Sequence, residues 1–285
     1  MPRDHRFDLF RLSLRERIQP GLLDSLETQR SREEWIRHLF SQSTKFRHHN
    51  TNFVYIPTDP EASHPYVVGK IGRPVSEIEN RPPEEGYEEY VHDAWKAAVV
   101  VCDPRESDDG QKVAIQLHMD VGKPTTLAPR LLQAMEAGQE YIQYLSAIHP
   151  ITNNEAFSDF VERNQGRITN IKFELEVPNM FGSDDEYDRE MKEFRDKDKA
   201  QKVAIEIKNP DGIDANSDRV KFTASKAMNQ GTGTVKATAM GKGNTFSSQE
   251  QQKSAKIPMD QESDESPLIE RAASMADRIL GRNED

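Results

Sequence analysis

Two stretches, Ile171-Lys-Phe-Glu-Leu-Glu-Val177 and Lys202-Val-Ala-Ile-Glu-Ile-Lys208, decide the fold that this sequence predicts. In both, apolar residues alternate with polar ones, which is the period of a β-strand. Strands that are buried on both faces are continuously apolar, so the alternation indicates a sheet with one face packed and the other in water. The expected architecture is therefore two layers, with helices on one side of the sheet only.

The neighbouring segments complete this C-terminal unit, which we place at residues 166–248. A charged amphipathic helix is expected to start at the capping-box pair Ser183 and Glu186, and a second helix near 217–229. A strand near 234–240 then turns into a last short strand. The order strand, helix, strand, helix, strand, strand predicts an α+β fold, a two-layer α/β sandwich of the ferredoxin-like βαβαββ type.

Residues 1–165 are expected to form a mixed N-terminal half of hairpins and helices. The apolar patterns predict strands at 7–14, 52–56, 66–71, 97–102 and 113–119, and helices after Ser31, at 127–145 and after Thr152. Residues 74–90 are rich in Glu and Pro, and this composition predicts a loop.

Composition and charge limit the function classes. The chain has 285 residues and a net charge of −11, so any contact with nucleic acid needs a local basic patch. Cys102 is the only cysteine, which excludes an internal disulfide and a multi-cysteine zinc site and favours a reducing compartment. Without a signal-peptide pattern or an apolar run long enough to span a bilayer, we predict a cytoplasmic protein with no membrane contact.

The end of the chain divides into two segments. Residues 249–266 are poor in apolar side chains and are expected to be a disordered linker. Residues 267–285 are expected to hold an amphipathic helix, whose apolar stripe between Pro267 and Leu280 has no local partner. Docking on the body of the protein and contact with a protein partner, including self-association, are equally favoured by this pattern.

The C-terminal unit resembles a known family. The residues that carry the resemblance are Arg167 to Asn179, the charged helix after them, Lys202 to Lys208 and the small-residue strand that ends the unit. In pattern and order they are similar to an uncharacterised bacterial family, domain of unknown function 4747. The resemblance implies a setting among bacterial mobile-element and phage-defence genes, and it implies no catalytic residues.

A locally basic segment is the candidate for nucleic-acid contact. Trp35 and Phe46 lie near its cations, and such a patch can meet phosphates and stack a base. The alternative is an amphipathic helix with an ordinary charged outer face. The candidate binding residues are Arg30, Arg32, Arg37, Lys45, Arg47 and His48.

Two weaker patterns suggest a nuclease. Glu206 and Lys208 have the spacing of a metal-binding carboxylate and a lysine, although the alternation places both on the wet face of their strand. Arg32 and His38 match a spacing of some helical ribonucleases, but six helical positions separate them by about 120° around the helix. No catalytic set, metal site or cofactor is therefore predicted.

These patterns favour a non-enzymatic component of a bacterial anti-phage defence or toxin-type system, which binds RNA or DNA or acts as an adaptor. The alternative is a nuclease effector of such a system, acting through the His48 region or through Glu206 and Lys208.

Overall fold

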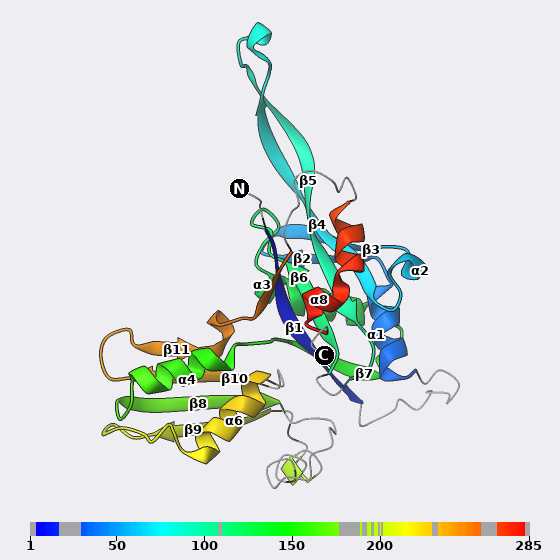
Figure 1. Ribbon diagram of the computed structural model, residues 1–285. Coiled ribbons are helices and arrows are strands. Elements are labelled where there is room, and N and C mark those ends of the chain that lie inside the picture. Colours follow the sequence, from blue (N-terminus) through cyan, green and yellow to red (C-terminus); the bar gives the residue numbers. More distant parts are fainter. Residues whose placement is uncertain are drawn as a thin grey trace.

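The structure is a computed structural model that describes residues 4–16, 30–107, 110–176, 189, 193–194, 197–198, 200, 202–229, 233–257 and 267–282. In this part of the chain, most of the regular structure belongs to two antiparallel sheets, and helices lie beside them (Figure 1). The predicted helix that starts at Ser183 falls mostly outside the described residues.

The first sheet has eight strands in the order β12-β1-β6-β5-β4-β3-β2, with β7 paired to the far half of β1. All of its pairings are antiparallel. Its strands are β1 (His5–Glu16), β2 (Thr44–His48), β3 (Thr51–Pro57), β4 (Val67–Asn80), β5 (Glu89–Asp103), β6 (Lys112–Gln116), β7 (Tyr144–Pro150) and β12 (Ser254–Ile257).

Helices cover both sides of this sheet. On one side α1 (Arg32–Phe40) and α3 (Pro124–Ala137) close the larger core, and the capping box of Ser31 and Glu34 starts α1 as predicted. On the other side α7 (Leu268–Ser274) and α8 (Ala276–Leu280) cover strands β4, β5, β6 and β12. The short elements α2 (Pro60–Ser63) and η2 (Pro83–Glu85) lie at turns.

The second sheet has four strands in the order β11-β10-β8-β9. They are β8 (Ile168–Glu176), β9 (Lys202–Lys208), β10 (Gly233–Ala239) and β11 (Thr245–Ser247). Their inward-facing residues pack with α4 (Asn154–Arg163) and α6 (Asp218–Asn229) into a separate core. The predicted strands and the helix near 217–229 are thus present, and Ile171, Phe173 and Ile205 face the core as the alternation indicated.

The predicted ferredoxin-like sandwich is wrong. That fold needs parallel strands joined across helices, whereas β8 pairs antiparallel with both β9 and β10, and the chain as described is mainly antiparallel sheet. A two-residue period shows which face of a strand is packed, but it carries no information about the direction of the neighbouring strand.

Three segments differ from expectation. Residues 74–90, expected as a loop, are mostly strand, because β4 and β5 pair without interruption from Val67 with Cys102 to Asn80 with Glu89. Helix α3 ends at Ala137 and β7 follows, so the predicted helix at 127–145 is too long. Within the expected linker at 249–266, η3 (Ser248–Glu250) and β12 are ordered, because β12 pairs with the edge of β1.

The C-terminal helical segment docks on the chain's own sheet. Ala272, Ala276 and Ile279 are fully or almost fully buried against the strands. Arg282 binds the buried carboxylate of Asp103, and Lys112 donates to the carbonyl of Leu280. The apolar stripe that suggested a partner contact at residues 267–280 is therefore already covered within the chain.

Candidate functional site

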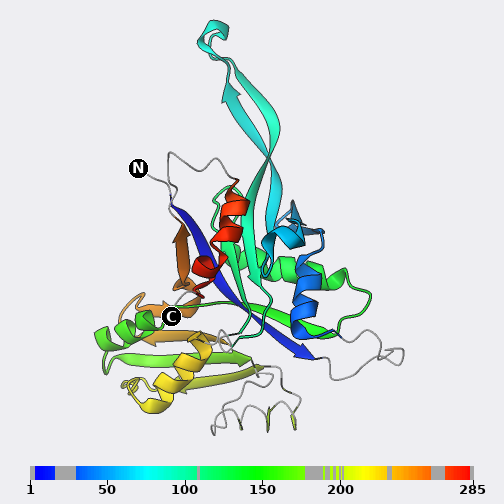
Figure 2. The ribbon, with the colours of Figure 1, turned by 45° about the vertical axis from the view of Figure 1, so that its right-hand side comes forward.

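The outer halves of β4 and β5 form an arm, residues 73–96, that projects from the first sheet. Strand β3 pairs with β4 only as far as Gly72, and β6 pairs with β5 only from Val100 onwards. Beyond these points the two strands continue as a twisted ribbon that extends away from the body in both views (Figures 1 and 2). Both long edges of this ribbon lack a neighbouring strand among the described residues.

One side of the arm is apolar and exposed. Residues that oppose each other in an antiparallel pair lie on the same side, so the pairs of Pro74 with Trp95 and of Ile78 with Val91 share it. Ile78 is 65% exposed, Val91 66% and Trp95 61%. We call these four residues the apolar arm face. Large apolar side chains gathered in the open in this way mark interaction surfaces.

The apolar arm face continues onto the first sheet. Lys45 pairs with Val54, which pairs with Gly72, and Gly72 precedes Pro74 by two residues on the same side. Ile56, which is 58% exposed, and Lys70 also lie on this side. The same side further along β4 and β5 is covered by α7 and α8. The helices therefore leave the part of the sheet nearest the arm uncovered in the described structure.

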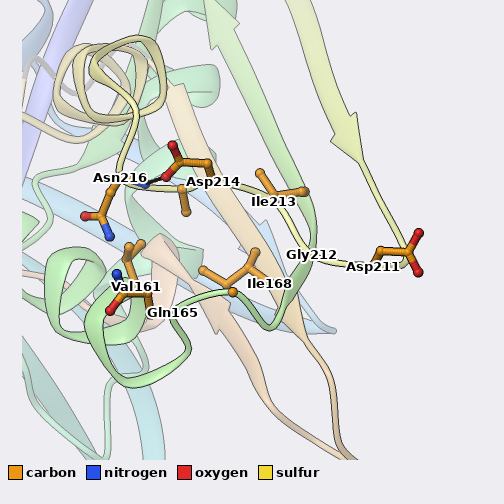
Figure 3. Close-up of a pocket in the computed structure, with 10 residues that line it drawn as sticks. Val161, Gln165, Ile168, Asp211, Gly212, Ile213, Asp214 and Asn216 are labelled. Atoms are coloured by element: carbon orange, nitrogen blue, oxygen red, sulfur yellow. Dashed lines mark hydrogen bonds between the residues drawn. The ribbon is translucent and has the colours of Figure 1, made fainter.

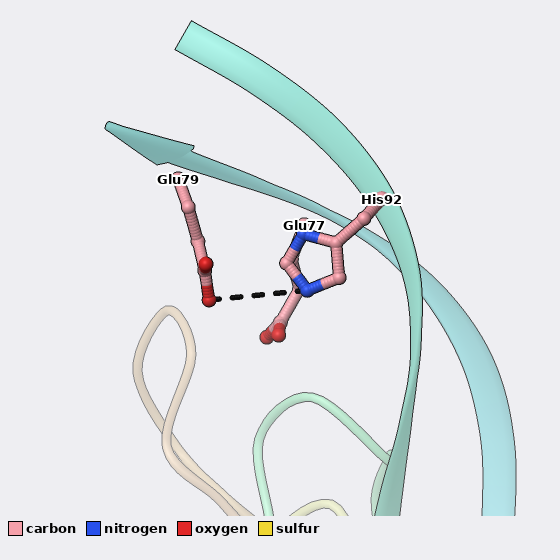
Figure 4. A group of neighbouring side chains, drawn as sticks. All are labelled: Glu77, Glu79 and His92. Atoms are coloured by element: carbon pink, nitrogen blue, oxygen red, sulfur yellow. Dashed lines mark ion pairs between the residues drawn. The ribbon is translucent and has the colours of Figure 1, made fainter. Parts of the chain in front are cut away.

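The opposite side of the arm is charged and internally paired (Figure 4). Lys96 forms an ion pair with Glu77, which raises the pKa of the Lys96 ammonium. The Tyr90 hydroxyl donates to Glu79, and the Tyr90 ring stacks on His92. A two-stranded ribbon is marginal by itself, so these contacts help to hold the arm in shape.

Glu77, Glu79 and His92 are also close enough to bind a metal ion together (Figure 4). Nε2 of His92 lies 3.8 Å from Oε1 of Glu79. Both carboxylates, however, already accept from Lys96 and Tyr90, and a cation would have to displace these donors. We therefore interpret the cluster as the paired, water-facing side of the arm.

The basic patch predicted from the sequence is divided between two sides of the first sheet. The buried face of α1 packs in the larger core, so Arg32 and Arg37 lie on that side, and Arg37 is paired with Glu33 at 2.7 Å. On β2, Phe46 packs against the same core, which turns Lys45 and Arg47 to the opposite side. Lys45 and Arg47 are both exposed there. The helix and strand cations do not form one surface.

Arg30 and the histidines of the patch have structural contacts. The backbone of Arg30 bonds with Gln143, in both directions. His38 contacts Gln139 at 2.8 Å and also contacts Gln42. Desolvation, followed by the charge of the adjacent His49, lowers the pKa of the His48 imidazole. His38 is therefore engaged by amides.

The nuclease-like pair Glu206 and Lys208 lies on the wet face of the second sheet. Glu206 accepts from Lys208 at 3.1 Å and from Asn170 at 3.1 Å, and these hydrogen bonds lower the pKa of its carboxyl. Its cross-strand neighbour is Lys172, so a cation rather than another acid opposes it. This is an exposed charge pair on a solvated face.

A hollow of about 280 Å³ lies between the end of α4 and the loop before α6 (Figure 3). Val161, Ile168 and Ile213 give it apolar walls. Of its two acids, Asp214 accepts from the backbone amide of Asn216, while Asp211 points away from the hollow. The lining thus contains neither a nucleophile with a base nor a pair of facing carboxylates.

No protein-family model and no curated protein matches this chain. No described helix is both long enough and apolar enough to cross a membrane.

The apolar arm face was missed at the sequence level. The signal was present in the two-residue spacing of Pro74, Ser76 and Ile78, and of Val91, Asp93 and Trp95. The run of Glu and Pro at its centre masked that period, because these residues are typical of loops.

Proposed function

We propose that this chain is a non-enzymatic adaptor, a protein-binding component that makes contact through the apolar arm face. The observation that carries the proposal is the exposure of Trp95, Ile78 and Val91 on one side of a ribbon that projects from the body. A protein that only had to remain stable would gain nothing from such residues in water, since each exposed apolar side chain forgoes burial.

The charges of the arm favour a protein partner over nucleic acid. Residues 73–96 contain seven acidic side chains and three basic ones, so the arm repels phosphates. The cations expected to bind RNA or DNA are split between two sides of the sheet, as described above. A non-catalytic role is also favoured because Glu206 is exposed and opposed by a lysine.

The proposed setting is a bacterial anti-phage defence or toxin-type system in the cytoplasm. This part of the proposal depends on the pattern resemblance of residues 167–248 and on the single cysteine, Cys102. Cys102 is buried, and burial raises the pKa of its thiol, so it is an inert core residue rather than a nucleophile.

Photo-crosslinking in cells tests the adaptor role. Benzoylphenylalanine would replace Ile78 in the full chain, and a matched variant would carry it at Phe222, an exposed aromatic position on α6 of the second sheet. We expect an ultraviolet-dependent adduct with protein at position 78 and none at position 222. An adduct with RNA or DNA at position 78, or none at all, would refute the adaptor proposal.

The rival functions have direct assays. Filter binding of RNA and DNA at low and high salt should show no affinity that depends on Lys45 and Arg47. Incubation of labelled RNA and DNA with the protein, with and without Mg²⁺, should give no cleavage that is lost in Glu206→Ala. Cleavage that is lost in this variant would replace the adaptor proposal by the nuclease alternative.

A further inference from the structure

The apolar arm face is not covered by any other part of the described structure, and the charge of the residues around it changes from the base of the arm to its tip. At the base, Lys45, Arg47 and Lys70 lie on the same side as the apolar residues. At the tip, Glu89, which pairs with Asn80, lies on this side, and Glu84, Glu85 and Glu88 are exposed near it, with Glu85 ion-paired to Arg81. The side that carries the apolar residues is therefore basic at one end, apolar in the middle and acidic at the other end.

We infer that the occupant is a second copy of this chain, bound face to face and antiparallel about a twofold axis through the middle of the arm. The inference rests on the proposed function, because it names the partner of the same apolar arm face. In a twofold contact, each group meets the group at the mirrored position of the other copy. The acidic tip of each arm then lies over the basic base of the other.

The spacing along the arm is consistent with this arrangement. From Gly72 to Asn80 the ribbon rises by about 26 Å, at roughly 3.3 Å per residue. With the axis near the pair of Ser76 and Asp93, Trp95 lies one pair to one side, and the pair of Ile78 and Val91 lies one pair to the other. Antiparallel superposition therefore places Trp95 of each copy over Ile78 and Val91 of the other.

The same superposition brings the tip to the base. Glu89 pairs with Asn80, two pairs beyond the axis, and Gly72 lies two pairs before it. Gly72 continues across the sheet into Val54 and Lys45. Glu89 of one copy is therefore carried to the row of Gly72 and Ala97 of the other, and Lys45 lies in the same row on β2, three strands from β5.

Contact area and charge favour this occupant over others. The exposed apolar side chains of one arm cover a few hundred Å² at most, while a stable interface needs about 800 Å² from each partner. In the twofold arrangement, the uncovered sheet surface at the base of each arm is also buried, and this adds to the contact area of both copies. A different protein would have to present acidic, apolar and basic zones in the mirrored order, which a second copy does by symmetry. Nucleic acid would face the acidic tip.

One residue opposes the association. Asp93 lies at the proposed axis, where it would approach Asp93 of the second copy. Its carboxylate already accepts from the Ser76 hydroxyl within the arm. The remaining repulsion between the two carboxylates disfavours the dimer. The apolar contacts and the attraction between the charges at the two ends of the arm must outweigh it.

Charge reversal distinguishes this dimer from any other. The tip variant is Glu88→Lys with Glu89→Lys, and the base variant is Lys45→Glu with Arg47→Glu. Each alone should weaken self-association of the full chain at least about tenfold in sedimentation velocity, because like charges then meet at both ends. An equimolar mixture of the two should restore a dimer, since each tip again meets an opposite base.

Three comparisons complete the experiment. A control reversal on α4, Glu155→Lys with Glu162→Lys, should leave association unchanged, because these exposed acids lie on the helix that packs with the second sheet. Trp95→Ser should weaken association, and mixing with either charge variant should not restore it. Circular dichroism of each variant should match that of the parent chain, since all the reversed positions are exposed.

The outcomes separate the two proposals. A chain that is monomeric at every concentration, a dimer indifferent to both reversals, or a mixture that stays monomeric would overturn the twofold dimer. If the crosslink at position 78 then captures a different protein, the adaptor function stands and this inference fails. If no crosslink forms at that position, the adaptor function fails as well.

Discussion

One side of the second sheet and the arm of the first sheet are not covered by any described helix, and the side chains on these two surfaces differ. On the second sheet, Lys172 pairs with Glu174 at 2.6 Å and Lys208 with Glu206 at 3.1 Å. On the arm of the first sheet, the uncovered side presents Trp95, Ile78 and Val91. An uncovered sheet face is ordinary in an antiparallel sheet, so exposure alone does not indicate binding. What distinguishes the arm is apolar surface left in water.

The largest effect should come from the packed face of the second sheet. Phe173 on β8 is fully buried, so Phe173→Ala should lower the free energy of unfolding by about 3–5 kcal/mol, through lost transfer energy and a cavity. On the opposite face, Glu206→Ala should leave the unfolding midpoint unchanged. Urea unfolding of both variants measures the contrast. Equal losses would mean that this wet face contributes to stability as the core does.

On the arm we expect the opposite result, in which a substitution weakens self-association and leaves the stability of the chain unchanged. Trp95→Ser should leave the urea midpoint of the chain unchanged and weaken self-association by about tenfold or more, because its ring is exposed in one copy and covered only by the second. Sedimentation velocity gives the dissociation constant.

Met240→Ser is the control for Trp95→Ser, since Met240 is exposed at the turn after β10 on the second sheet. It should change neither quantity. If Trp95→Ser instead unfolds the arm and leaves the dimer intact, Trp95 is a structural residue and the comparison between the two surfaces fails.

A smaller effect is expected at the centre of the arm. Asp93→Asn removes the like charges that meet at the proposed axis, so it should tighten the dimer about two- to fivefold. Asp93→Glu keeps the charge and should not tighten it. Weaker association of Asp93→Asn would place the axis elsewhere along the ribbon.

Local patterns predicted much of the fold. The alternation at 171–177 and 202–208 identified β8 and β9, and the pair Ser31 and Glu34 identified the start of α1. Each of these signals lies within a few residues of the structure that it specifies. Strand order and direction are set by contacts between distant segments, so the ferredoxin-like arrangement was not excluded by the sequence.

The candidate site was harder to predict for the same reason. The arm is held by pairings between residues far apart in the chain, such as Val75 with Ala94, and these outweigh the loop-like composition of its tip. The residues of the predicted basic patch do not form a single surface, because residues that are close in sequence need not lie on the same side of a sheet. On β2, Phe46 turns inward, and Lys45 and Arg47 therefore turn away from the arginines of α1.

The part of the first sheet that α7 and α8 cover offers the last contrast with the open arm. Arg105 donates to the Tyr66 hydroxyl, which bonds Asp277 on α8. Burial, followed by the bond to Asp277, raises the pKa of Tyr66 from 10.0 to about 12. Between pH 10 and 12 the unfolded chain loses this proton while the folded chain keeps it. The free energy of unfolding therefore falls as the pH rises through this range.

Tyr66→Phe should make that fall shallower, although Tyr55, whose pKa is also raised by burial, will keep part of it. Urea unfolding across this pH range measures the slope, with Tyr87→Phe at the exposed tip of the arm as the control. Hydrogen exchange at neutral pH should also be faster in α8 of Tyr66→Phe, because one of its attachments to the sheet is lost. An unchanged slope together with unchanged exchange would show that the remaining contacts hold α8 without Tyr66. The covering segment would then be held by its apolar packing and by the contacts of Lys112 and Arg282.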